Sequence, residues 1–188
     1  MPRAIRSRMG SRSLRAVLLR HGLVSVEWLE WAVASAPGTQ STWLELLVLH
    51  GAIDDERVCG CIATAAWLPR CVPQQLSEIA RVALVRVPAD LAVEHRAVPI
   101  AVESDGLRVA MIDPIDDAAV DELEFFAGCS ILREVASATA IAWALHRHYG
   151  CFTALCPPPT VQAAPARRVS SPSAGRATPA PRPPASPP

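Results

Sequence analysis

The chain has 188 residues, of which 51% are hydrophobic, and its formal net charge is zero. This length predicts one or two small domains with a real hydrophobic core, and the balanced charge gives no reason to expect a specific nucleic-acid partner. The eighteen basic residues are all arginines, which excludes sites built on a lysine, such as a P-loop, a Schiff base or a lysine general base.

The start of the chain predicts a basic, disordered arm at residues 1–11. Arginines recur there without an acid or an aromatic residue among them, as in tails that contact anions without specificity. The apolar run that follows, Ala16–Leu19, is cut by Arg20 and is too short for a signal peptide. No stretch of about 18 apolar residues occurs. We therefore expect a cytoplasmic protein with reduced cysteines and no membrane insertion.

One helix-glycine-helix pattern occurs twice between residues 12 and 68. In each copy an apolar helix leads to His-Gly, two apolar residues and a polar residue that starts a second apolar helix. Gly22 and Gly51 stand where a helix ends in a left-handed residue, and Ser25 and Asp54 are suited to cap the next helix. The pattern predicts a helical subdomain at 12–68 that consists of two helical hairpins.

The remainder of the chain predicts an α+β subdomain and a tail. A connector at 69–87 contains a short helix near 74–83. The elements expected at 88–150 are, in chain order, a helix at 88–97, a strand at 97–104, an Asp105-Gly106 turn, a strand at 107–113, a helix from Asp116 or Asp117 to about Ala127, a strand at 130–136 and a helix ending at Gly150. This order indicates an α+β fold with a small antiparallel or mixed three-stranded sheet packed with helices. The Pro-rich segment 151–188 predicts a disordered tail.

The sequence offers no catalytic motif. It contains no nucleophile elbow, P-loop, dinucleotide-binding or zinc-protease pattern, so we expect no enzymatic activity. The acids between 113 and 124 are expected at the solvated start of one helix, where negative charge is favourable.

The cysteines and histidines leave a metal-binding or redox protein open as an alternative. The candidate groups are Cys59 with Cys61 and Cys71, and the cluster His146, His148, Cys151 and Cys156. Their spacing fits zinc poorly, and half-buried thiols and cations at a helix end are the simpler interpretations.

Tryptophans are concentrated in the predicted helical subdomain. Trp28 flanks the apolar stripe of its helix, whereas Trp31 falls off that stripe. Burial between the two hairpins and exposure as a surface for a protein partner are both open for these side chains.

Residues 95–150 carry several signals in a fixed order. They are Val98-Pro99-Ile100, the strand end Ala110-Met111-Ile112-Asp113-Pro114, Gly128 after an acidic helix, and Tyr149-Gly150 after the last helix. This order resembles the amino-terminal domain of type II secretion and type IV pilus assembly ATPases. That domain has a P-[LI] strand, a turn, a strand ending in A-x-x-D-P, an acidic helix, a further strand and a helix closing in Y-G.

The repeated pattern is similar to the helical subdomain of the same family. In some members it carries two copies of the motif R-L-G-x-x-L-L-x-x-G-L-L-x(4)-L-x(3)-L-x-x-Q, which binds cyclic di-GMP. The apolar and glycine positions are kept in both copies, but the motif's Arg falls on Ser13 and Thr42, and its Gln on Ala36 and Ala65. The ligand-binding candidates implied by the resemblance are Arg12, Arg15, Leu18, Leu19, Gly22, Leu23, Leu47, Val48 and Gly51.

The resemblance implies a free-standing, degenerate copy of this amino-terminal domain, without the nucleotide-binding engine. We expect a non-catalytic adaptor or regulatory domain of a type II secretion or type IV pilus system, acting through a protein partner of the assembly machinery. Trp28 and Trp31 are the expected partner surface, and no cofactor is required. Cyclic di-GMP sensing is the main alternative, and Cys/His metal binding is the second.

Overall fold

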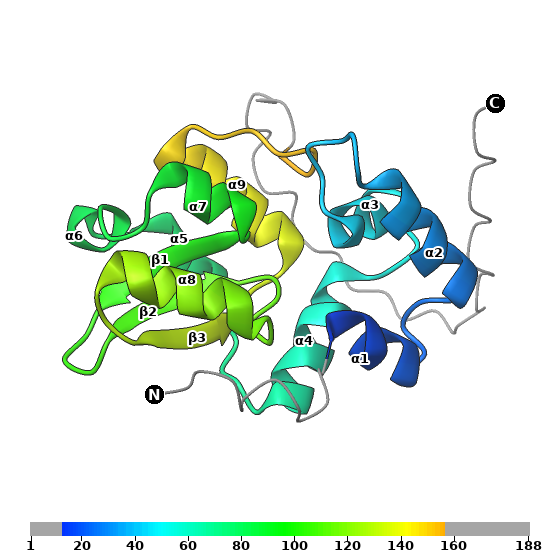
Figure 1. The fold of residues 1–188 in the computed structure, drawn as a ribbon, viewed down its shortest axis with the longest axis horizontal. Coiled ribbons are helices and arrows are strands. Elements are labelled where there is room, and N and C mark those ends of the chain that lie inside the picture. Colours follow the sequence, from blue (N-terminus) through cyan, green and yellow to red (C-terminus); the bar gives the residue numbers. More distant parts are fainter. Residues whose placement is uncertain (1–12, 157–188) are drawn as a thin grey trace, which may run out of the picture.

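The computed structural model describes residues 13–156. The predicted arm at 1–11, Arg12 and the predicted tail beyond 156 lie outside the described residues. Within the described range, a helical half (residues 13–68) packs beside an α+β half (residues 69–156), and both contribute to one hydrophobic core (Figure 1).

The helical half contains the two hairpins that the repeat predicts. Its helices are α1 (Leu14–Arg20), α2 (Val26–Ser35), α3 (Trp43–Leu49) and α4 (Asp55–Ala66). Each starts at a side-chain cap, in which Ser13, Ser25, Thr42 or Asp54 accepts a hydrogen bond from the backbone N–H three residues later. After α1 and α3 the chain reverses through Gly22 and Gly51, whose φ angles are +63° and +66°. Among the described helices, none is both long enough and apolar enough to cross a bilayer.

The segment expected as a connector is part of the α+β half. It forms two short helices, α5 (Pro73–Ser77) and α6 (Arg81–Leu84), where the sequence predicts one. Leu76, Ala83 and Val87 from this segment are buried in the core. The backbone of Cys71 also donates a hydrogen bond to Val135 at 2.8 Å, so the segment extends the edge of the sheet.

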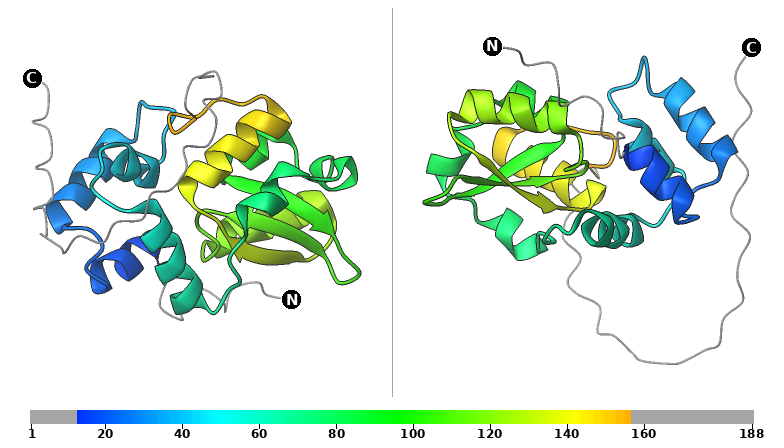
Figure 2. Two further views of the ribbon diagram at one scale, coloured as in Figure 1. Left: turned by 180° about the vertical axis from the view of Figure 1, so that it is seen from behind. Right: turned by 60° about the horizontal axis from the view of Figure 1, so that its bottom comes forward.

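The α+β half has the mixed three-stranded sheet that the sequence predicts. Its elements are α7 (Ala89–Glu94), β1 (Ala97–Val102), β2 (Leu107–Met111), α8 (Asp117–Ala127), β3 (Ile131–Val135) and α9 (Ala138–Tyr149). β1 pairs antiparallel with β2, and β2 pairs parallel with β3, in the order β1-β2-β3. Helices α8 and α9 cover opposite faces of the sheet (Figure 2).

The turn between β1 and β2 is displaced by one residue from the prediction. Glu103 donates to the carbonyl of Gly106 at 2.8 Å, so Ser104 and Asp105 form the loop. Neither Asp105 nor Gly106 has a positive φ, which excludes the predicted Asp-Gly turn of type I′. Gly106 serves a different purpose, because a Cβ at this position would lie 2.3 Å from the carbonyl oxygen of Ser130.

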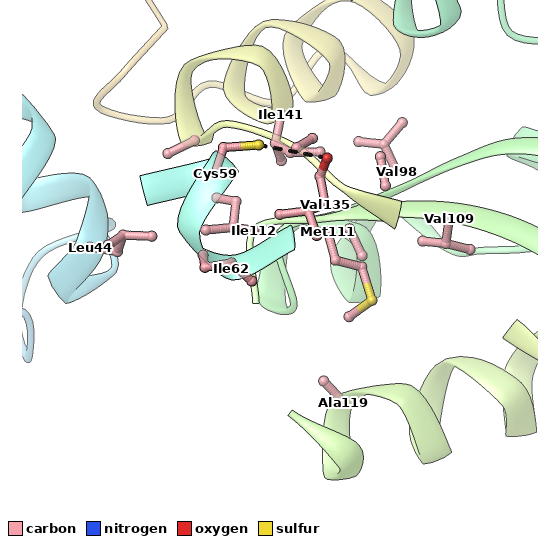
Figure 3. Close-up of a cluster of buried hydrophobic side chains, with 14 of the residues drawn as sticks. Leu44, Cys59, Ile62, Val98, Val109, Met111, Ile112, Ala119, Val135 and Ile141 are labelled. Atoms are coloured by element: carbon pink, nitrogen blue, oxygen red, sulfur yellow. Dashed lines mark hydrogen bonds between the residues drawn. The ribbon is translucent and has the colours of Figure 1, made fainter. Parts of the chain in front are cut away.

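The shared core lies where α4 meets the sheet. Figure 3 shows Cys59 and Ile62 of α4 next to Val135 of β3, with Ile141 of α9 nearby. The Cys59 thiol lies 3.8 Å from the carbonyl oxygen of Val135, and all four side chains are buried. The two halves are therefore joined by apolar packing and not only through the chain.

Candidate binding site on the helical repeat

The two His-Gly turns of the repeat lie next to each other and line one surface hollow of about 330 Å³. Gly22 and Leu23 come from the first copy, and Gly51, Ala52 and Ile53 from the second. A Cβ on either glycine would meet nothing within 4 Å. The glycines are therefore required by their positive φ angles, and not by crowding from neighbouring atoms.

Only some of the predicted ligand-binding residues line this hollow. Gly22, Leu23 and Gly51 line the hollow. Leu18 and Leu47 are fully buried, so they support the turns from inside the core and do not face a ligand. Leu19 is exposed and Val48 is half-buried, but neither lines the hollow.

The cations are arranged differently from the prediction. Arg15 does not line the hollow, and its guanidinium lies over the Trp43 ring, 5.5 Å from the centroid. Arg57 does line it, and sequence reasoning missed this residue because the motif has no basic residue there. The only signal was its position three residues after the cap Asp54. Trp28 holds the matching position after Ser25, so the two copies differ at this point.

The polar positions of the motif have lost their ligand-binding groups. The hydroxyl groups of Ser13 and Thr42 accept the capping hydrogen bonds of α1 and α3. Ala36 and Ala65 have no polar side-chain atom. The apolar framework of the repeat is thus kept, while the side chains at these positions serve the helices themselves.

Two of these positions face a second hollow, which is lined by both acidic and basic residues. Ala36 and Thr42 line this hollow of about 270 Å³ together with Glu94, Asp113 and Asp116. Burial, opposed by a hydrogen bond from the Ile115 backbone, raises the pKa of Asp113 to about 6. His95 and Arg96 also line this hollow, and each is paired with a carboxylate, Glu122 and Glu45 respectively.

The two tryptophans predicted as a partner surface form part of a ring cluster. Trp28 is only 5% exposed, so the prediction that it offers a surface is wrong: its helix turns the indole into the core. Trp31 is half-buried, with its ring edge-on to those of Trp28 at 5.4 Å and His50 at 4.7 Å. Of the pair, only Trp31 reaches the surface.

A buried ion pair ties the helical half to the α+β half. Arg96, which precedes β1, donates to both carboxylate oxygens of Glu45 in α3, at 2.8 and 3.0 Å. It also donates to the backbone carbonyls of Gln40 and Val93. Glu45 is 0% exposed and accepts a further bond from the Thr42 backbone at 2.7 Å. Arg96 holds a left-handed backbone with φ +47°, a strained conformation that the four hydrogen bonds stabilise.

A second polar link connects α4 to α9. The carboxylate of Asp55 accepts hydrogen bonds from the backbone of Ala138 and Thr139, each at 2.8 Å. Ser137, which directly precedes α9, makes no side-chain capping bond. The helix α9 is thus capped by a residue distant in the chain, and the two halves form one unit.

The candidate metal residues do not assemble. No group of three or more His, Cys, Asp or Glu residues within 13–156 could hold a metal ion. His148 bonds the carbonyl of Leu76 at 2.7 Å, and His146 packs its ring against Phe152. Burial raises the pKa of the Cys71 thiol to about 12, which disfavours the thiolate needed for metal binding.

Comparison with known protein families gives a match over the α+β half. Residues 68–155 match the MshEN domain family. Two type IV pilus assembly ATPases, both named PilB, are similar in sequence. The protein from Thermus thermophilus is 28% identical over 153 residues, covering 80% of this chain and 17% of its own length. The protein from Myxococcus xanthus is 30% identical over 139 residues, covering 74% of this chain and 24% of its own. The chain therefore spans less than a quarter of these relatives.

Solved structures extend the likeness to the helical half. MshE, solved with cdg, superimposes with a TM-score of 0.50 and 25% identity, covering 73% of this chain and 99% of the other. The N-terminal domain of XpsE superimposes with a TM-score of 0.59 and 20% identity, covering 74% and 98%. The predicted resemblance is confirmed: residues 68–155 match the MshEN domain family, and the chain is similar in sequence to the pilus assembly ATPases.

Proposed function

We propose that this protein is a non-catalytic adaptor or regulatory domain of a type II secretion or type IV pilus system, and that it acts by binding a protein of that machinery. The observation that carries the proposal is the state of the repeat. Its apolar framework and both glycine turns are intact, while the positions of the motif's Arg and Gln hold Ser13, Thr42, Ala36 and Ala65. A scaffold kept without these polar groups favours a role in recognition over one in catalysis or strong ligand binding.

The helical half offers the partner a surface of defined composition. Leu49, at the end of α3, is 47% exposed, and the following residue, His50, packs against Trp31. Val26, at the start of α2, is 53% exposed. Exposed apolar side chains on a helical surface mark a candidate interaction site for a protein partner.

Affinity purification from the source cells tests the proposal. We expect the tagged protein to recover a component of the secretion or pilus machinery, identified by mass spectrometry. Leu49→Arg should reduce this recovery at least about tenfold. The matched control is Val82→Arg on α6 of the α+β half, where the side chain is 57% exposed against 47% for Leu49, and it should leave recovery unchanged. Recovery of no such component by the wild-type protein would contradict the proposal.

A second candidate function, cyclic di-GMP binding, has one specific observation in its favour. The two glycine turns line a single hollow that also contains Arg57, and the structurally similar MshE was solved with cdg, that is, cyclic di-GMP. The N–H groups of Gly22, Leu23, Gly51 and Ala52 donate to helix carbonyls, and Asp54 also lines the hollow. The guanidinium of Arg57 is therefore the group at these turns that supports phosphate binding.

Isothermal titration calorimetry with cyclic di-GMP decides this second candidate. Binding through this hollow predicts a measurable heat that Arg57→Gln reduces at least about tenfold in affinity. The control Arg81→Gln removes an exposed arginine of the distant α6 and should have no effect. Absence of heat up to about 1 mM ligand removes the candidate.

A further inference from the structure

Trp67, the residue that follows α4, combines two unusual properties. Its side chain is 92% exposed, and its backbone is left-handed with φ +56°. Its backbone N–H closes α4 on the carbonyl of Ala63, at a position where glycine is preferred. A bulky residue there costs stability and displays an indole to solvent, which points to a role outside the fold.

Trp67 stands at the edge of a basic groove of about 870 Å³. The groove runs between α1 and α4, which lie side by side (Figure 1), and the loop at Pro114–Ile115 closes it. Its cationic side chains are those of Arg20 and Arg133, His21 also lines it, and the described residues that line it include no carboxylate. Arg133 is partly neutralised by Asp117 at 3.1 Å, whereas Arg20, at the end of α1, faces solvent.

The outer face of α8 has the complementary chemistry. Its exposed positions 118, 121, 122 and 125 recur at the spacing of one helical face. Asp121 supplies negative charge, and so does Glu122, whose carboxylate also contacts His95 at 3.0 Å. Phe125 is 81% exposed beside Phe126, which is 52% exposed. An acidic and aromatic helical stripe is the kind of face that docks in an apolar groove rimmed by cations.

We propose that the groove at Trp67 binds the α8 face of a second copy of this protein. The charge complementarity supports this occupant, since Arg20 would meet Asp121 or Glu122 while Phe125 packs against Trp67. Trp67 and Phe125 are the two most exposed large hydrophobic side chains in the described part of the chain. The contact would bury Trp67 of one copy and Phe125 of the other, and so remove these apolar side chains from solvent.

Sedimentation velocity of the full chain under reducing conditions tests the proposal. We expect reversible self-association, half complete at about 10–100 μM, and weakened as salt rises from about 0.05 to about 0.5 M. Trp67→Gly and Phe125→Ser should each weaken self-association at least about tenfold. Both variants keep their fold, because Trp67→Gly places glycine at a left-handed position and Phe125 is almost fully exposed. The melting temperature of Trp67→Gly should be unchanged or higher by up to about 4 °C.

Mixing the two variants gives the decisive result. The Phe125→Ser copy keeps its groove and the Trp67→Gly copy keeps its α8 face, so the mixture should form a one-to-one complex that neither forms alone. A charge exchange gives a second readout: Arg20→Glu blocks association, and combining it with Asp121→Arg and Glu122→Arg restores it. A wild-type protein that stays monomeric at about 1 mM, or variants that associate like the wild type, would overturn the proposal. A mixture that does not associate would also overturn it.

Discussion

The two halves of the molecule differ in where their stabilising contacts come from. In the helical half, each helix begins at a side chain that accepts a hydrogen bond from the backbone N–H three residues later. Each hairpin turns at its own glycine. In the α+β half, several decisive contacts come from far along the chain: Asp55 caps α9, Ser130 approaches Gly106, and Glu45 neutralises Arg96. The caps and turns of the repeat are local contacts, whereas the α+β half is stabilised in addition by contacts between residues far apart in the chain.

This difference explains what the sequence could and could not predict. The helices of the repeat and their caps were predictable because capping and helical periodicity act within four residues. The strands and α8 were predictable from alternation and from Asp116 and Gly128 at the helix ends. The hollow between the glycine turns, the burial of Trp28 and the groove at Trp67 were not, since each depends on how separate helices pack.

The largest expected effect comes from breaking the ion pair between the halves. Arg96→Met leaves the Glu45 carboxylate buried without its partner, and we expect a loss of about 3–5 kcal/mol in the free energy of unfolding. Urea denaturation followed by circular dichroism measures it. The control Glu45→Gln/Arg96→Met removes both charges and keeps a capping amide at position 45. Its free energy of unfolding should therefore decrease by less than that of Arg96→Met. Equal losses in the two variants would show that packing, not charge, joins the halves here.

The close approach of Gly106 to the Ser130 backbone can be tested with a pair of glycine substitutions. In Gly106→Ala the new methyl group meets the Ser130 backbone at 2.3 Å, so β2 or β3 must shift, and we expect a loss of about 2–3 kcal/mol. The matched control is Gly60→Ala, inside α4, where the nearest atom would be a flexible Arg70 nitrogen at 3.8 Å. The free energy of unfolding of Gly60→Ala should increase by up to about 1 kcal/mol. Thermal unfolding of both variants separates crowding from helix propensity.

The buried carboxyl of Asp113 predicts a pH-dependent stability. Asp113 has a pKa of about 6 against an ordinary value of 3.8, mainly because it is buried and also because Asp116 is near. The native state therefore binds this proton more tightly than the unfolded state, and stability decreases as pH rises from about 4 to about 6.

Replacing this carboxyl should remove its contribution. At pH 7.5 we expect Asp113→Asn to be more stable than the wild type by about 1–2 kcal/mol, with the difference vanishing near pH 4. Asparagine can still accept the hydrogen bond from the Ile115 backbone. Denaturation of both proteins across this pH range provides the measurement, and a gain that is independent of pH would contradict burial of the charge as its cause.

The smallest expected effect tests the symmetry of the repeat itself. Gly22 and Gly51 have nearly equal φ angles, and both have open space at the Cβ position, so Gly22→Ala and Gly51→Ala should each cost only backbone strain, about 1 kcal/mol. Because the two turns are local and equivalent, the losses should match within about 0.5 kcal/mol and add in the double variant. Unequal losses would mean that one turn depends on the α+β half, and the local character of the helical half would then hold for one hairpin only.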